Sequence, residues 1–289
     1  MKLFKGLLSA LLVCVIVSVS NAQEEPVLEN PNSVNPIPEY EQFYKKRVWR
    51  RMDLKEKQNQ GFFAKGNEIT KIIMEAVDAG ILTPYMNDSL VREMPLETYK
   101  KNLLPEGMDE PSDEEGDLGW GDDSGWGDDG GGWGDEGDGE GGEAEPEEEV
   151  SFDFLPQDLS ILHLTEDVIF DRRRSRLYYD IQAITIIVPA EQFTTGVYRQ
   201  VATFKYKDLE ALFRSQPNEA IWFNRQNSAE HKNIADAFLL RLFHAPLWKL
   251  ENPENDAIAD VYGEGKRAMV ASEWQEMMLL EKEHNLWEY

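Results

Sequence analysis

Residues 106–149 form a tract that is not expected to fold, and it lies between two stretches that are. Twenty of its residues are Asp or Glu, 14 are Gly and none is Lys or Arg, so it supplies −20 of the formal net charge of −26. Glycine loses the most conformational entropy on ordering, and neighbouring carboxylates repel one another, so a compact state of this tract is unfavourable. We therefore predict a long disordered acidic insertion and look for function in the flanking sequence.

Within the acidic tract, a unit of Trp, Gly, Asp and one further acid begins at Trp120, Trp126 and Trp133. Exposed tryptophans spaced by Gly and Asp are typical of motifs that bind by docking one aromatic anchor at a time. Repeat expansion without a functional consequence explains the pattern equally well. Loose association of calcium with the carboxylates is compatible with this composition, but no spacing predicts a defined calcium site.

The first 22 residues have the pattern of a secretory signal peptide. Lys2 and Lys5 precede a short apolar stretch at residues 7–19, and Ser20-Asn21-Ala22 gives a small-x-small cleavage site. This apolar stretch is too short for a membrane span. The only cysteine, Cys14, lies inside it, so we expect an exported chain without a disulfide or a thiol nucleophile.

Two stretches, residues 39–105 and 150–289, are predicted to be the N-terminal and C-terminal parts of one folded domain. A surface loop tolerates extra length at little entropic cost, so one domain carrying a long insertion is favoured over two small domains, which are the alternative. Residues 23–38 contain four prolines and are expected to be an extended lead-in.

One helix is predicted before the acidic tract. Asn67 is a candidate N-cap, and the apolar residues from Ile69 to Val77 recur at the spacing of one helix face. Gly80 suits the end of this helix, with Pro84 beyond it.

After the tract, the pattern predicts a mixture of strands and helices. Strands are expected at residues 177–188, 197–206 and 220–223. A capping-box pattern at residues 227–230 predicts a helix with apolar residues from Ile234 to Phe243 on its buried side. A last helix is predicted at residues 270–283; the residues spaced for one of its faces are Trp274, Met277, Met278 and Glu281.

Strands and helices do not alternate regularly enough for a parallel sheet. We therefore predict the α+β class, with a small antiparallel sheet packed with helices and a long disordered acidic Gly/Asp/Trp insertion.

No arrangement of residues predicts catalysis, a metal site or a cofactor. The four histidines, at positions 163, 231, 244 and 284, do not have the spacing of zinc ligands. The Gly-Asp-Asp-Ser-Gly run at residues 121–125 has one Asp too many for a serine-protease nucleophile motif and lies in the acidic tract, where no oxyanion hole is expected. We predict a protein that is not an enzyme.

Two basic clusters stand out in this acidic chain. The first comprises Lys45, Lys46, Arg47, Arg50 and Arg51, and the second comprises Arg172, Arg173, Arg174 and Arg176. One interpretation is a solvated face and a hairpin turn; the other is that a cluster meets the acidic tract, from this or a neighbouring copy, or an acidic partner protein. Nucleic acid is not an expected partner for an exported chain of this charge.

Residues 44–59 have the sequence Tyr-Lys-Lys-Arg-Val-Trp-Arg-Arg-Met-Asp-Leu-Lys-Glu-Lys-Gln-Asn. This segment resembles the Lys-Arg-Val-Trp-Arg-x-x-Asp-Leu-Arg-Glu-Lys-x-Asn segment of the GldN family, also called PorN. The resemblance continues through residues 184–189 and 220–243 and closes on residues 283–289, which are similar to the family's Asp-Leu-Trp-Glu-Tyr terminus. It covers most of the chain except the lead-in and the acidic tract.

The resemblance implies a periplasmic ring or scaffold component of the gliding-motility and type IX secretion machinery of Bacteroidetes. It implies a partnership with an outer-membrane lipoprotein of the GldK or PorK type, which tethers the protein to that membrane, and with motor proteins of the GldL and GldM type. It also implies a homo-oligomer in a large ring. The acidic tract is a departure from the family pattern.

Two places are candidates for a partner interface. Trp49, between Arg47 and Arg50, is a candidate anchor with its cations stacked at an interface, where Trp and Arg are enriched. The end of the chain carries Leu286, Trp287 and Tyr289, large apolar residues that are expected to pack against the body or a partner. Plain core packing is the alternative for both places.

The sequence therefore favours a non-enzymatic scaffold subunit that is needed for protein secretion. The alternative is an exported binding module whose acidic Trp-Gly-Asp repeats capture calcium or a basic partner.

Overall fold

The computed structural model describes residues 29–105 and 154–287. The predicted signal peptide, residues 23–28 of the lead-in, the acidic tract and Tyr289 lie outside the described residues. The expectations for those segments are therefore not addressed by the fold.

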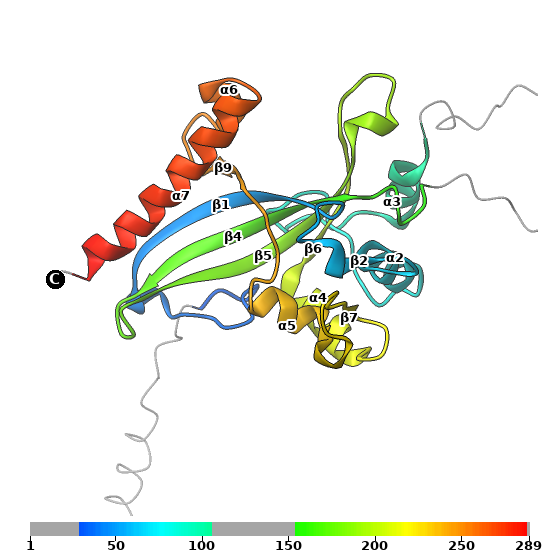
Figure 1. The fold of residues 1–289 in the computed structure, drawn as a ribbon, viewed down its shortest axis with the longest axis horizontal. Helices are drawn as coiled ribbons and strands as arrows, with labels where there is room; N and C mark the ends of the chain where they lie inside the picture. The colour runs from blue at the N-terminus through cyan, green and yellow to red at the C-terminus, as the bar shows by residue number, and fades with distance from the viewer. Residues whose placement is uncertain (1–28, 106–153, 288–289) are drawn as a thin grey trace, which may run out of the picture.

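A five-stranded antiparallel sheet with the order β6-β5-β4-β1-β9 forms the centre of the molecule (Figure 1). The strands are β1 (Gln42–Asp53), β4 (Ile161–Asp171), β5 (Arg176–Val188), β6 (Arg199–Lys205) and β9 (Leu247–Leu250). β1 precedes the acidic tract and β4 follows it, yet the two pair over nearly their whole length. The predicted α+β class with an antiparallel sheet is confirmed.

Helices cover this sheet, and short strand pairs lie beside it. The helices are α2 (Ile69–Asp78), α3 (Leu96–Leu103), α4 (Tyr206–Ser215), α5 (Ile234–Leu239), α6 (Ile258–Tyr262) and α7 (Lys266–Leu286). The short strands are β2 (Phe63–Ala64) with β3 (Asn67–Glu68), and β7 (Ile221–Trp222) with β8 (Lys232–Asn233).

Two apolar cores hold the helices against the sheet. The larger one packs α2, α3, α4 and α5 against the sheet, with Phe204, Phe213 and Phe238 among its fully buried side chains. The smaller one lies under α6 and α7, where Leu279 contacts the part of the sheet that contains Val48 and Val168. Figure 1 accordingly shows α7 beside β1 and β9, well separated from α4 and α5.

The second basic cluster forms the turn of the β4–β5 hairpin, as one of the two interpretations predicted. The Asp171 carboxylate accepts hydrogen bonds from the backbone N–H groups of Arg173 (2.7 Å) and Arg174 (3.2 Å). An Asp that binds the backbone two residues on is a common way to start a turn. Ser175 completes the turn with a φ of 49°.

Two predicted helix starts are wrong by a few residues. α2 begins at Ile69, but Asn67 does not cap it, because its side-chain amide donates to the carbonyl of Ile221 (3.0 Å). Asn227 caps only a three-residue 3₁₀ turn. α5 begins at Ile234, where the side chain of Asn233 accepts from the N–H of Ala235 (2.9 Å).

The three predicted strands are found, but one of them does not belong to the main sheet. Residues 177–188 and 197–206 correspond to β5 and β6, whereas residues 220–223 contain the short strand β7, which pairs with β8 apart from the main sheet. β1 was not predicted because its five Lys and Arg residues hide the apolar alternation of a half-buried strand.

Candidate partner interface

The basic residues of β1 bind carboxylates on the neighbouring strand β4. The Arg47 guanidinium donates to both oxygens of Asp167 (2.7 and 3.0 Å), and Lys45 lies 3.2 Å from the same carboxylate. Asp167 is fully buried. Burial alone would raise the pKa of Asp167, but the hydrogen bonds and charges of Arg47 and Lys45 outweigh it and hold the pKa below its usual range.

Trp49 is half-buried and points to the same side of the sheet as Arg47. Its indole N–H donates to the Asp88 carboxylate (2.6 Å), and the ammonium group of Lys249 lies 4.6 Å from the ring centroid. The cation over this ring is therefore a residue of β9. Arg47 and Arg50, the expected stacking partners, bind carboxylates instead.

Arg50 lies on the opposite side of β1, inside a buried ion cluster. Its guanidinium donates to Glu166 of β4 (3.0 Å), to the carbonyl of Ala245 (2.8 Å) and to Glu276 of α7 (2.5 Å). Arg241, which follows α5, binds both oxygens of the same Glu166 (2.9 and 3.2 Å). Glu166 is fully buried, so one carboxylate on the central part of the sheet accepts from two arginines.

This ion cluster joins the two helical layers. Arg241 and Arg50 also lie over the ring of Tyr179, at 4.7 and 5.8 Å from its centroid. Burial lowers the pKa of the Arg50 guanidinium, but Glu166 and Glu276 raise it further, so Arg50 stays charged. The cluster thereby fixes α7, through Glu276, at a defined position on the sheet.

The outer side of α7 carries six exposed apolar side chains. The opposite side of the helix packs on the sheet through Ala271, Ser272 and Leu279. The exposed apolar residues are each at least 43% exposed; they are Met269, Val270, Trp274, Met277, Met278 and Leu280. Glu273 and Glu281, which are also exposed, lie among them. Several large apolar side chains exposed together mark an interaction site.

Residues of α6 extend this patch. Val261 and Tyr262 are exposed at 56% and 44%, and α6 contacts α7. We call the exposed apolar residues of α6 and α7 the α7 face.

The end of the chain divides its apolar residues between the core and the surface. Leu286 packs against the smaller core. Trp287 is 58% exposed, while its indole N–H donates to the carbonyl of Ser175 in the β4–β5 hairpin (2.8 Å). This contact fixes the end of α7 beside the hairpin. Tyr289 lies outside the described residues.

A comparison with known protein families finds a match. A family model described as "Gliding motility associated protein GldN" matches residues 37–288. The chain belongs to the GldN family. The match spans both parts of the sheet, and it places the chain among components of the gliding-motility and type IX secretion machinery. No match was found among curated proteins.

The described ranges of this GldN-family chain contain no cluster of metal-binding residues. No group of three or more His, Cys, Asp or Glu is arranged to hold a metal ion there. His163 lies against Trp248, with ring centroids 4.6 Å apart, and burial together with Arg51 lowers the pKa of His163 to about 3. None of the helices in residues 29–105 and 154–287 has both the length and the apolar content of a membrane-spanning segment.

Sequence reasoning selected Arg47 and Arg50 but missed the acids that bind them. Glu166 and Asp167 are adjacent in a run of otherwise mostly apolar residues, 161–170. Charged residues inside such a run are rarely buried unless they are paired. That signal predicts two buried carboxylates on opposite faces of one strand, each in need of a cation.

Proposed function

We propose that this GldN-family chain is a non-enzymatic scaffold subunit of the type IX secretion and gliding machinery. In this proposal it is exported to the periplasm, assembles with copies of itself into a ring, and binds an outer-membrane lipoprotein of the GldK or PorK type. It meets motor proteins of the GldL and GldM type on the side facing the inner membrane. Membrane association is through these partners.

The observation that supports an assembly role best is the α7 face. Its apolar side chains come from a helix that is tied to the sheet by the ion pair between the buried Arg50 and the half-exposed Glu276. A rigid, preformed apolar surface loses little entropy on binding, so it suits a permanent interface. Methionine and tryptophan are both enriched in interface cores.

A double variant, Trp274→Asp and Met277→Asp, tests this assignment. Both side chains are exposed, so the variant should fold and be exported normally while its envelopes lose the lipoprotein from the complex and secrete less protein. The matched control, Ile81→Asp and Val91→Asp, changes two equally exposed apolar residues outside the α7 face and should assemble normally. Normal complexes from the α7 variant would reject the α7 face as the interface.

We further propose that the chain end, Leu286 to Tyr289, and the segment around Arg47, Trp49 and Arg50 contribute to assembly. Leu286, the last residue of α7, packs against the smaller core, and the Trp287 indole donates to the β4–β5 hairpin. Removing residues 286–289 should therefore abolish secretion. Normal secretion after this truncation would limit the interface to the helix itself.

A further inference from the structure

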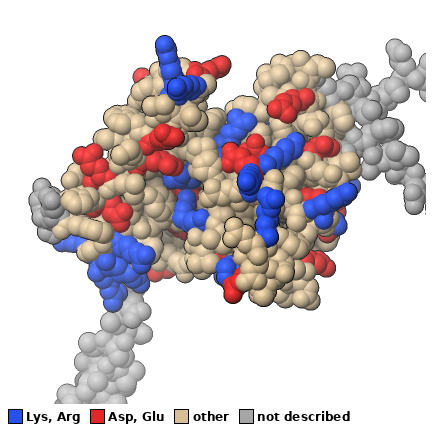
Figure 2. Space-filling view, in the orientation of Figure 1, with Lys and Arg blue, Asp and Glu red and all other residues tan. Residues whose placement is uncertain are grey.

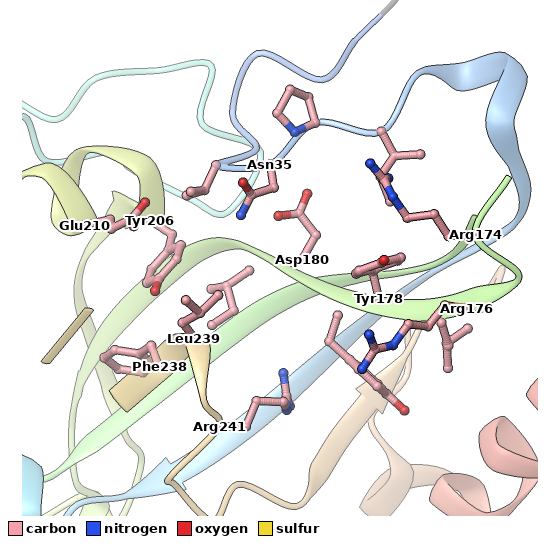
Figure 3. A pocket seen from close by; sticks show the side chains of 16 residues that line it. Asn35, Arg174, Arg176, Tyr178, Asp180, Tyr206, Glu210, Phe238, Leu239 and Arg241 are labelled. Carbon is pink, nitrogen blue, oxygen red and sulfur yellow. The ribbon is translucent and has the colours of Figure 1, made fainter. Parts of the chain in front are cut away.

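A cavity of about 860 Å³ lies between one edge of β5 and residues 34–37, next to the β4–β5 hairpin (Figure 3). β6 pairs only with residues 183–188 of β5, so within the described residues the segment 176–182 has a strand partner, β4, on one side alone. The N–H of Leu177 on this segment donates to the Glu283 carboxylate. An open strand edge offers backbone donors and acceptors to an extended peptide.

The lining of this cavity combines three kinds of group. Tyr178 provides a flat aromatic surface. The Asp180 carboxylate accepts from the side-chain amide of Gln182 (2.6 Å) and keeps acceptor capacity for a further N–H donor. Arg174 and Arg176 provide cations at the rim. Arg176, Tyr178 and Asp180 alternate along β5 and share one face of the strand, where the Arg176 guanidinium lies 5.9 Å from the centroid of the Tyr178 ring (Figure 3).

The hairpin at the rim is a concentrated basic patch. Arg172, Arg173, Arg174 and Arg176 are all exposed. Arg173 and Arg174 pair with acids of the described chain, whereas Arg172 and Arg176 make no ion pair within it. Figure 2 shows a cluster of basic side chains at the end of the molecule where Figure 1 places this hairpin.

We infer that this edge of β5, with residues 172–176 at its rim, docks the Trp-Gly-Asp-acid units of the acidic tract of a neighbouring copy. The indole ring lies against Tyr178 and its N–H donates to Asp180 on the same face of β5, while the acids that follow bind Arg174 and Arg176. The tract contains no Lys or Arg that the rim would repel. The inference rests on the proposed function for the presence of neighbouring copies.

The fold favours a neighbour over the same copy as the source of the tract. The described residues on the two sides of the tract lie near α3, because the N–H of Phe154 donates to the carbonyl of Leu103 (2.9 Å). The side chain of Asn102 in α3 donates to the Val201 carbonyl of β6 (2.9 Å). The hairpin lies at the other end of β4. At about 3.3 Å per residue, the 11 residues of β4 alone separate the two ends by roughly 36 Å.

To reach the hairpin of its own copy, the tract would have to return along this whole length of the sheet. Copies arranged end to end would instead bring the tract of one molecule beside the hairpin of the next. Because one tract carries three Trp-Gly-Asp-acid units, it raises the local concentration of tryptophan at the hairpin it reaches.

Disulfide trapping tests the inference in the full-length chain. All variants carry Cys14→Ser, which removes the only native cysteine. A hairpin variant, Ser175→Cys, is mixed with a tract variant, Ser124→Cys, and assembled complexes are oxidised at low ionic strength. The expected result is a disulfide-linked dimer of the two variants, with a yield that falls as salt is raised because the rim contacts are ionic.

Two sets of variants test the specificity of this product. Reversing Arg172 and Arg176 to Glu, or changing the three tract tryptophans to Ala, should each lower the dimer yield by about tenfold. The matched control for charge is Lys55→Glu with Lys57→Glu, two exposed residues away from the hairpin, and it should leave the yield unchanged. A cysteine at the exposed Ser228 should trap little product.

Three outcomes would overturn the inference. The first concerns a chain that carries both Ser175→Cys and Ser124→Cys. If this chain forms only an intramolecular disulfide and the mixed variants form no dimer, the tract binds the hairpin of its own copy. The second is equal trapping at Ser228, which would make the contact non-specific. The third is the absence of a disulfide-linked dimer, and the size of the complex then identifies the cause. An intact large complex would reject only the docking of the tract. Free chains would reject the proposed function as well.

Discussion

Two adjacent carboxylates explain why β1 carries so many cations. Asp167 and Glu166 are both fully buried and point to opposite faces of β4, and each is bound by a basic residue of β1. A buried ion pair adds little net stability compared with an apolar pair, but removing one partner leaves an uncompensated charge. The interpretation of the first basic cluster as a solvated face is therefore wrong for Arg47 and Arg50.

Changing Glu166 to Ala should be strongly destabilising. The change leaves the buried guanidinium of Arg50 and that of Arg241 without their shared acceptor, so we expect the free energy of unfolding to fall by about 3–5 kcal/mol in urea titrations. The control, Glu210→Ala, removes the ion pair with the half-exposed Arg214 and should cost less than about 1 kcal/mol. A similar small loss for both variants would contradict the structural role of the cluster.

Asp180 should make the stability of the fold depend on pH. Burial raises its pKa to about 6, so between about pH 4 and 6 the folded state binds a proton that the unfolded state does not. The ionised Asp180 therefore lowers the free energy of unfolding above pH 6, and this destabilisation disappears as the pH falls to about 4. Asp180→Asn should be more stable than the native chain at pH 7.5, and the difference should shrink towards pH 4.5.

The matched variant, Asp167→Asn, should behave in the opposite way. Arg47 and Lys45 hold the pKa of Asp167 below its usual range, so its contribution favours folding at neutral pH and is lost as the pH falls through the lowered pKa. Equal pH dependence of the two variants in chemical denaturation would contradict the assignment of their environments.

At the scale of elements, α7 packs one side on the sheet and leaves its other side exposed. The spacing of Trp274, Met277 and Met278 identifies a helix face from sequence alone, and the structure shows that this face is exposed while Leu279 is buried. Periodicity reveals that residues share a face, but it does not tell which of two apolar faces the chain itself covers. That information depends on tertiary contacts.

The two sides of α7 should respond differently to truncation. Leu279→Ala should lower the free energy of unfolding by about 2–5 kcal/mol, because it leaves a cavity in the smaller core. Met277→Ala should change it by less than about 0.5 kcal/mol, since Met277 is 68% exposed. Thermal unfolding of both variants measures the difference, and comparable losses would mean that the outer side is covered within the molecule.

Other elements show where sequence patterns suffice and where they fail. α2 and β5 were predicted because their apolar residues follow a regular period and end at Gly80 and Pro189. β4 was missed because Glu166 and Asp167 interrupt its apolar run, and β9 because four residues are too few for a period. The ion cluster was not predicted either, since it joins β1 to residues more than 100 positions away.

At the scale of the whole molecule, one sheet is completed by strands from both sides of the acidic tract. β1 pairs with β4 on one side and β9 on the other, so the N-terminal segment lies between two strands of the C-terminal segment. A domain closed in this way can carry a long insertion without disturbing its core. The α7 face and the hairpin are both exposed on this one sheet-centred fold.

The size and composition of the complex formed by a tagged copy in gently solubilised envelopes tests the central claim most directly. Our account predicts a very large particle that contains many copies of this chain and an outer-membrane lipoprotein in a fixed ratio. A free species near the chain's own mass of 33.2 kDa, without a lipoprotein, would contradict it.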